Sequence, residues 1–454
     1  MVEVSLSRFV HDLDLGEHIA VWHSLRLRPV FLTKQAYHNL QEGLCEEADF
    51  DELKRCRIIT TSEHEDDEVL AKIQSMHPGP GISLGYFILS ERCNLACKYC
   101  FVGEHSSARR CLMSSQDMTE ETAEKALHFF IKQLEGSGID FTENKSQLIF
   151  FGGEPLIGYD VLVYVARRVH ELSDEHPVLK STGMTVITNG TLLTEERLLE
   201  MKSLGVSVNI SIDGSTRTAN SMRVYPSGRE AYDKIIEALD LCKRLEMPPS
   251  LSITLSEQTI EDLPGLLELL QKYDVRGLGY NILLSSDDYE LPDEYYEKAS
   301  QFIIDSFEVF RKVGIYEDRI MRKLNCFANA QIYFSDCGAT AGGQLVFTPD
   351  GRVGVCQGLI AEKEFFVTDL DDEEFDATKH PVWQEWATLS PLNNPECFDC
   401  EALGICGGGC PVNARALHPE RGLNCKDERQ CVHAKKTLEY LIGDLYRKAL
   451  KGTA

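Results

Sequence analysis

The sequence predicts an α/β protein whose largest part is built on a parallel sheet. From residue 79 to about residue 285, short apolar segments alternate with segments in which apolar residues recur at helical spacing. The apolar segments have the length of strands, and the segments between them can hold helices, so the strands are expected to run parallel. The expected strands are 83–89, 147–151, 184–188, 206–212, 250–255 and 277–284.

The expected helices follow these strands in order. The first begins after Thr119, a residue type that caps helices, and two glutamates and a helical apolar pattern then continue to Gly136. Further helices are expected around 159–173, at 194–204, around 229–245 and at 261–273.

Composition narrows the class of protein. The chain of 454 residues suits two or three domains, and it shows neither a stretch of 18 apolar residues nor a signal peptide, so we expect a cytoplasmic protein that spans no membrane. The net charge of −26 argues against binding to nucleic acid or to an anionic membrane. Sixteen cysteines in such a chain indicate metal rather than disulfides.

Three cysteines follow the first expected strand at close spacing. Cys93, Cys97 and Cys100 stand in the run Cys-Asn-Leu-Ala-Cys-Lys-Tyr-Cys-Phe. A zinc site needs four ligands, whereas three thiolates can hold three irons of a 4Fe–4S cube and leave the fourth iron open. An open iron can chelate a small molecule. Tyr99 is suited to packing against a bound base, and Phe101 is assigned to the same cofactor site.

Further motifs lie where the later strands end. Paired glycines let a backbone approach a ligand closely, and a carboxylate beside them complements an ammonium group. Several features in fixed order over about 120 residues form a far more specific pattern than any one of them. The motifs are Gly152-Gly153-Glu154-Pro155, Thr188-Asn189-Gly190 and Ser211-Ile212-Asp213-Gly214.

The cysteine run and these motifs together resemble the radical S-adenosylmethionine (radical SAM) enzymes. The resemblance implies that the sheet curls into a partial (β/α)6 barrel with the motifs at the carboxyl ends of its strands. It implies a 4Fe–4S cluster on the three cysteines that binds S-adenosylmethionine, with residues 152–155 at the methionine amino group and Ser211 and Asp213 at the ribose. Arg223 is a candidate for holding the carboxylate or the ribose, and an ordinary surface arginine is the alternative.

A second set of cysteines lies in the C-terminal third. Thirteen residues separate Cys337 from Gly351, and four more separate Gly351 from Cys356. Turn residues at 349–351 between two apolar segments predict a hairpin there. A denser run follows, with the pattern Cys397-x2-Cys400-x5-Cys406-x3-Cys410.

This second set resembles the SPASM extension of radical SAM enzymes, which implies two auxiliary 4Fe–4S clusters and three clusters in all. Cys431 is preferred over Cys425 as a late ligand because it opens an expected helix, and a pair of structural zinc sites is the alternative. Carried over, the first auxiliary cluster takes Cys337, Cys356 and Cys410 with Cys326 as fourth ligand, and the second takes Cys397, Cys400, Cys406 and Cys431. The remaining thiols are expected to be buried or incidental, at Cys45, Cys56, Cys111 and Cys242.

The first 78 residues differ from the rest. Residues 20–32 favour strands, Thr33 begins a short helix, a second helix begins within 51–54, and an acidic run at 63–68 leads into a third. This order resembles the winged-helix-like α+β module of enzymes that modify ribosomally made peptides, in which a leader peptide adds a strand to a sheet edge. A cap that only shields the barrel is the alternative. The expected domains are 1–78, 79–320 and 321–454.

The resemblance implies an enzyme whose 5′-deoxyadenosyl radical takes hydrogen from a peptide. Gln357 follows Cys356, where sulfatase-maturing relatives carry an aspartate as the proposed base, and an amide cannot act as a base at neutral pH. We therefore expect a maturase that crosslinks a ribosomal precursor peptide, preferably through a cysteine thioether, with a flavodoxin- or ferredoxin-type electron donor. A carbon–carbon crosslink, sulfatase maturation and a multi-cluster electron-transfer protein are the alternatives. The sequence assigns no catalytic base.

Overall fold

The computed structural model describes residues 1–60, 62, 64–100, 116–285 and 289–452, so the expected cofactor contact Phe101 lies outside the described residues, as does Cys111. The chain divides into two compact units. The region expected as 321–454 is shared between them, because its first strands extend the barrel sheet. The first unit joins 1–78, 319–337 and 388–454, and the second joins 79–318 and 338–387.

The second unit is built on one sheet, which has ten strands among the described residues, in the order β14-β13-β12-β11-β10-β9-β8-β15-β16-β17. Strands β8 to β14 run parallel to their neighbours, and β15 is parallel to β8. The six predicted strands are confirmed within two residues of their expected bounds, as β8 (Leu84–Ser90), β9 (Gln147–Gly152), β10 (Gly183–Thr188), β11 (Val206–Ile212), β12 (Ser250–Leu255) and β13 (Gly277–Ile282).

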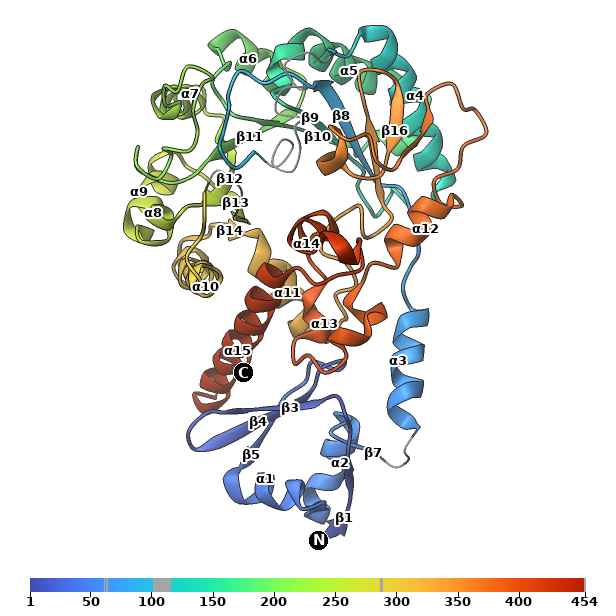
Figure 1. Cartoon of the computed structure of the whole chain (residues 1–454), viewed down its shortest axis with the longest axis vertical. Coiled ribbons are helices and arrows are strands. Elements are labelled where there is room, and N and C mark those ends of the chain that lie inside the picture. The colour runs from blue at the N-terminus through green and yellow to red at the C-terminus, as the bar shows by residue number, and fades with distance from the viewer. Residues whose placement is uncertain (61, 63, 101–115, 286–288, 453–454) are drawn as a thin grey trace. The chain divides into compact units, whose positions relative to one another are not determined.

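Helices connect these strands and follow one another round the outside of the curved sheet (Figure 1). The first is capped by Thr119 as predicted, since its side chain accepts from the N–H of Thr122 at 3.1 Å. A short helix before α9 was not expected; it forms because Ser256 and Thr259 make a capping box. The helices are α4 (Glu120–Gly136), α5 (Tyr159–Leu172), α6 (Glu195–Ser203), α7 (Tyr232–Arg244), α8 (Glu257–Ile260), α9 (Leu263–Lys272) and α10 (Tyr295–Val313).

The two faces of the curved sheet differ in burial. Along β11, Val208 and Ile210 are buried. Asn209 and Ser211, which alternate with them along the strand, are only partly covered. Side chains alternate between the faces of a strand, so the buried set packs on the helices and the partly covered set lies on the inner face. Ser211 therefore lies on the inner face, beside the carboxyl end of its strand.

The predicted hairpin is confirmed next to the barrel strands. Strand β15 (Gln344–Phe347) pairs antiparallel with β16 (Arg352–Gly354), which pairs in turn with β17 (Phe366–Asp369). Gly351 takes a positive φ of 79° in the turn, a conformation that favours glycine. The unit also contains β14 (Tyr316–Glu317) and α12 (Pro381–Ala387).

The first unit begins with a small α+β module. Strands β3, β4 and β5 form an antiparallel sheet in that order, and the short pairs β1–β6 and β2–β7 lie beside its helices. Thr33 caps α1, as expected. The bounds are β1 (Val2–Glu3), β2 (Ser5–Leu6), β3 (Val10–Asp14), β4 (His18–His23), β5 (Val30–Thr33), α1 (Lys34–Gln41), β6 (Leu44–Cys45), α2 (Glu47–Arg55), β7 (Ile59–Thr60) and α3 (Glu65–Ser75).

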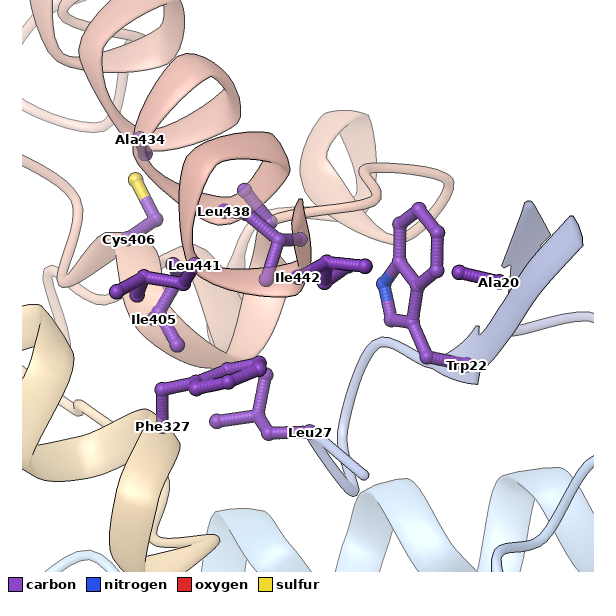
Figure 2. Close-up of a cluster of buried hydrophobic side chains, with 11 residues drawn as sticks. Ala20, Trp22, Leu27, Phe327, Ile405, Cys406, Ala434, Leu438, Leu441 and Ile442 are labelled. Carbon is purple, nitrogen blue, oxygen red and sulfur yellow. The ribbon is translucent and has the colours of Figure 1, made fainter. Parts of the chain in front are cut away.

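The C-terminal helices of the first unit pack on this module. Figure 2 shows Trp22 of β4 directed toward Ile442 of α15, with Cys406 near Ala434 of the same helix. The Trp22 ring also donates from Nε1 to the carbonyl of Glu401 at 3.1 Å, so the N-terminal module and the C-terminal residues share one core. The remaining helices of this unit are α11 (Asp318–Asn329), α13 (Leu403–Cys406), α14 (Pro411–Leu417) and α15 (Glu428–Leu450). Within the described residues no helix is long and apolar enough to cross a bilayer.

Candidate active site

Glu154 lies fully buried just beyond the carboxyl end of β9. Its carboxylate accepts from the Thr188 hydroxyl at 2.6 Å and from the N–H groups of Asn189 at 2.8 Å and Leu156 at 3.0 Å. Among the described residues no lysine, arginine or histidine comes within ion-pair distance of it. Burial raises the pKa of Glu154, and the three hydrogen bonds and the charge of Arg197 only partly oppose the shift. Within the described residues the site thus holds a buried carboxylate that forms no direct ion pair.

The two glycines before Glu154 lie directly against the backbone that follows β8. Gly152 has a φ of 142°, and a Cβ there would collide with the carbonyl oxygen of Ser90. A Cβ at Gly153 would in the same way collide with the Arg92 backbone. The glycines are therefore needed because the chain between β8 and the first cysteine passes directly over them. This contact fixes the start of the cysteine loop against the Glu154 segment.

The thiols of Cys93, Cys97 and Cys100 lie close enough to interact electrostatically. Burial, and to a smaller extent Glu154, Cys100 and Cys97, raises the pKa of Cys93 to about 12. Burial likewise raises the pKa of Cys97 to about 11, with Arg223 acting in the opposite direction. Thiols in such surroundings ionise when a metal binds them, since the metal replaces the proton. The three side chains thus fit the predicted cluster.

Backbone hydrogen bonds join the cysteine loop to the segment after β11. The N–H of Ala96 donates to the carbonyl of Val224 at 2.7 Å, and the N–H of Lys98 donates to that of Met222 at 3.1 Å. The side chain of Asn94, which the sequence did not single out, donates to Thr191 at 2.8 Å and accepts from Asn189 at 2.9 Å. Asn94 stands between the predicted ligands Cys93 and Cys97 in the sequence, and this position was the signal that could have identified it.

Asp213, Arg223 and Tyr99 form a buried network at the carboxyl end of β11. Arg223 donates from Nε to Asp213 at 2.8 Å, and the Tyr99 hydroxyl donates to both carboxylate oxygens at 2.6 and 2.5 Å. The Arg223 guanidinium also lies 5.6 Å from the centre of the Tyr99 ring. Burial disfavours the charge on Arg223, yet the Asp213 carboxylate raises the pKa of the guanidinium above its usual range.

This network bears on the expected position of Arg223 and on the expected roles of Tyr99 and Asp213. Arg223 is 7 % exposed, so the surface position considered for it is wrong. The Tyr99 hydroxyl and Arg223 both donate hydrogen bonds to the carboxylate of Asp213. These three residues therefore fix the cysteine loop against β11, whatever else they contact. Pro155 opens the short turn after Glu154, and Ser211 lies on the inner face of the sheet two residues before Asp213.

Four of the C-terminal cysteines lie together within the first unit. Burial, and to a smaller extent the neighbouring Cys397 and Cys400, raises the pKa of Cys431 to about 12. Cys406, which is buried, has its pKa raised by burial and then by Cys431 and Cys400, while Lys323 acts in the opposite direction. One cavity is lined by Cys397, Cys406 and Cys431. The side chain of Gln430 donates to the carbonyl of Cys406 at 2.9 Å and so ties the two segments together.

The other predicted ligands are distributed differently. Cys425 lines the same cavity, but its thiol donates to the carbonyl of Gly422 at 3.1 Å, and the charges that act on it come from arginine and carboxylates. Cys337 raises the pKa of Cys410, so these two lie near each other in the first unit. Cys356 belongs to the second unit, directly before Gln357. Burial raises the pKa of Cys326, with only Lys323 acting on it besides.

Clusters and single metal ions make different demands on these side chains. Within the described part of the chain, no three side chains of histidine, cysteine, aspartate or glutamate are grouped as ligands of one ion. In a 4Fe–4S cube each cysteine binds a separate iron, so the ligands surround the cube and do not meet at one point. Cys397, Cys406 and Cys431 line one cavity, and Cys400 lies close enough to act on Cys406 and Cys431, so these four thiols have this character.

The comparisons with known proteins define the class of this site. Residues 87–270 match the model of the Radical SAM superfamily. This part of the chain is thus similar to the Radical SAM superfamily, whose members bind a 4Fe–4S cluster and S-adenosylmethionine. The matched residues include Cys93, Cys97, Cys100, Glu154 and Arg223.

Individual relatives narrow the class further. The chain is 27 % identical over 351 residues to the radical SAM cyclopropyl synthase TigE of Paramaledivibacter caminithermalis, with 75 % of this chain and 70 % of that protein covered. It is 25 % identical over 354 residues to a cysteine-type anaerobic sulfatase-maturating enzyme of Clostridium perfringens, with 73 % and 89 % covered.

Two solved structures share the fold. Native anSMEcpe with bound AdoMet superposes with a TM-score of 0.64 at 19 % identity, over 81 % of this chain and 99 % of that one. Streptococcus suis SuiB superposes with a TM-score of 0.51 at 14 % identity, over 94 % and 99 %. SuiB has also been solved bound to its precursor peptide SuiA, and that structure superposes with a TM-score of 0.50.

Proposed function

We propose that this enzyme matures a ribosomally made precursor peptide by a radical SAM reaction that forms a crosslink. Glu154 carries the proposal: it is a buried carboxylate that forms no direct ion pair among the described residues, beside three thiols that fit an open 4Fe–4S cluster. When bound, the cluster and S-adenosylmethionine supply a 5′-deoxyadenosyl radical that abstracts hydrogen. The proposed roles of Gly152–Pro155 and Glu154 are to hold the methionine ammonium, and those of Ser211, Asp213 and Arg223 are to hold the ribose end.

The residues around this site also explain how the reacting parts would be held in place. Ala96 and Lys98 bind the segment after β11, and Asn94 binds the loop after β10, so the cysteine loop is joined to two neighbouring strand ends. A cofactor held between such segments is oriented before the reaction begins, which is how a protein contributes to radical chemistry supplied by a cofactor.

The proposed substrate is a peptide, because several similar proteins act on peptides or bind them. SuiB has been solved with a precursor peptide, and its fold covers 94 % of this chain, including the N-terminal module. In that module β3 and β5 are the edge strands of a three-stranded sheet among the described residues. An edge strand offers unpaired N–H and C=O groups, to which a leader peptide can add as a further strand.

A cysteine thioether is the proposed product. Its formation joins a peptide carbon to a cysteine sulfur with net loss of two hydrogen atoms: the 5′-deoxyadenosyl radical takes one from carbon, and the thiol loses a proton while one electron passes to an oxidised auxiliary cluster. We propose three clusters in all, the first auxiliary one on Cys326, Cys337, Cys356 and Cys410 and the second on Cys397, Cys400, Cys406 and Cys431.

A carbon–carbon bond is the second candidate, favoured by the similarity to the cyclopropyl synthase TigE. Sulfatase maturation is less well supported by the site, although sulfatase-maturating relatives match most of this chain. The amide oxygen of Gln357 accepts from the side chain of Gln344 at 2.7 Å, and an amide in this position offers no general base.

The test uses the full-length holoenzyme with a precursor peptide encoded beside its gene. We expect a peptide product lighter by two hydrogen atoms and one fewer thiol open to alkylation, together with one 5′-deoxyadenosine per product. An unchanged thiol count with the same mass loss would replace the thioether by the carbon–carbon bond. A formylglycine product would overturn the crosslinking proposal.

A strand-directed variant tests leader recognition without removing the module, which shares its core with α15. The N–H of Ser24 donates to the carbonyl of Phe9, so the alternation of an antiparallel pair directs the N–H of Asp12 away from β4. Asp12→Pro removes that donor at the edge. We expect it to slow modification of the full precursor at least tenfold and to leave a leaderless core peptide and uncoupled cofactor cleavage unaffected. Equal rates on the full precursor would exclude recognition at the β3 edge.

A further inference from the structure

Lys323 of α11 lies almost wholly inside the first unit. Its side chain is 1 % exposed, and it contacts the Tyr333 ring with its ammonium 5.5 Å from the ring centre. A carboxylate oxygen of Asp336 lies 3.8 Å from its Nζ, which is too long for a direct hydrogen bond. A buried ammonium is costly unless other charges balance it.

Asp336 is shared between two cations. The guanidinium of Arg322 lies 3.7 Å from the same carboxylate oxygen that faces Lys323, and Arg322 also donates to the backbone carbonyl of Asp336 at 2.5 Å. The carboxylate therefore does not belong to Lys323 alone. Arg319, Arg322 and Lys323 all act on Asp336 and hold its pKa below its usual range despite burial. Two cations, Arg322 and Lys323, thus face one carboxylate oxygen of Asp336.

This positive region faces the thiol of Cys406. Tyr333 and Asp336 lie along the Cys406 turn, because the N–H of Tyr333 donates to Gly404 at 2.8 Å and that of Asp336 donates to Gly407 at 2.9 Å. Burial lowers the pKa of Lys323, whereas Asp336 and then Cys406 favour its charged form. Lys323 and Cys406 thus lie close enough to interact electrostatically.

A second polar group faces the same region without a protein partner. His433 of α15 is completely buried, and within the described residues neither of its ring nitrogens has a hydrogen-bond partner. Lys323, Arg319 and Arg322 all act on this ring. Buried polar atoms without partners are rare in folded proteins and often mark the place of a group that the protein binds. His433 thus lies near the same buried cations as Asp336.

We propose that Lys323 is a positioning residue for the cluster at Cys397, Cys400, Cys406 and Cys431, and that its buried ammonium raises the reduction potential of that cluster. The inference rests on the proposed second auxiliary cluster. Four thiolates give a cubane a net negative charge, and one-electron reduction makes that charge larger, so a fixed cation stabilises the reduced form more than the oxidised form. The cluster would thereby be suited to accept an electron.

The experiment is a redox titration with dithionite, followed by electron paramagnetic resonance. The background is the full-length Cys93→Ala, Cys97→Ala, Cys100→Ala variant, which lacks the first cluster. Lys323→Met should move the midpoint of one auxiliary signal to a more negative potential, because the ammonium is replaced by a neutral chain of similar shape. Lys323→Arg should restore the charge and most of the potential, whereas the exposed Lys72→Met should change neither.

Asp336→Asn should shift the midpoint potential in the opposite direction. It provides the test if Lys323→Met fails to fold. Removal of that carboxylate should move the same signal to a more positive potential. Normal iron content with unmoved midpoints in both variants would overturn the inference and leave the cluster in place.

Cys431→Ala distinguishes failure of the cluster from failure of the inference. It should remove about four irons per chain and the signal that responds to Lys323, whereas Cys425→Ala should remove neither. Unchanged iron content in Cys431→Ala would overturn the cluster assignment and the inference with it.

Discussion

The two candidate cofactor regions bury different charged groups. In the barrel, Arg223 is paired with Asp213 at 2.8 Å, whereas the buried carboxylate of Glu154 forms no direct ion pair among the described residues. In the first unit, Lys323 and Arg322 both face one carboxylate oxygen of Asp336. A buried charge that the protein does not balance indicates the sign of its missing partner. The barrel region suits an ammonium, and the C-terminal region suits an anionic cluster.

The largest effect is expected on the stability of the barrel, when the ion pair of Arg223 and Asp213 is broken. Arg223→Met leaves the buried Asp213 without its cation and should destabilise the barrel by about 3–5 kcal/mol, measured as a lower urea midpoint. Arg217→Met is the matched control. Arg217 stands six residues before Arg223 and makes exposed ion pairs with Glu230 and Asp233, so its replacement should leave the urea midpoint nearly unchanged.

A double variant sharpens the interpretation of that loss. Arg223→Met combined with Asp213→Asn removes both charges and should recover part of the stability. No recovery would mean that Arg223 stabilises the barrel by packing and not by its charge.

A smaller effect is expected on cofactor affinity, when the carboxylate of Glu154 is replaced. Glu154→Gln should weaken S-adenosylmethionine binding by about ten- to a hundredfold, since a charge-assisted hydrogen bond is worth roughly 1.5–3 kcal/mol, and should leave iron content unchanged. Isothermal titration of the anaerobic holoenzyme measures the affinity. The same affinity in the variant would exclude Glu154 as the ammonium partner.

The pH dependence follows from the same residue. Burial raises the pKa of Glu154, and binding of an ammonium requires the ionised form, so affinity should be full at high pH and fall as the pH drops through this raised value. The loss should therefore set in at a higher pH than an ordinary glutamate would give. Glu154→Gln should lack this dependence.

The comparison also shows what the sequence could predict. The six barrel strands and the motifs at their ends were predictable, because strand periodicity and the spacing of cysteines and glycines are local features. The placement of Thr33 and Thr119 as helix caps was predictable for the same reason.

Features that depend on distant segments could not be predicted. The collision that requires Gly152 involves Ser90, and the burial of Arg223 depends on Asp213 and Tyr99. Lys323 carries no motif, and only the fold brings it beside Asp336 and Cys406. The division of the region after residue 320 between two units likewise follows from the pairing of β15 with β8.

The central claim is that Cys93, Cys97 and Cys100 hold the cluster that cleaves S-adenosylmethionine. The most direct measurement is the 5′-deoxyadenosine formed by the reduced, reconstituted protein, compared with the variant in which all three cysteines are alanine. We expect steady formation by the natural chain and none by the variant, which should contain about four fewer irons and keep its auxiliary clusters. Cleavage by the triple variant at an undiminished rate would contradict the assignment of this site.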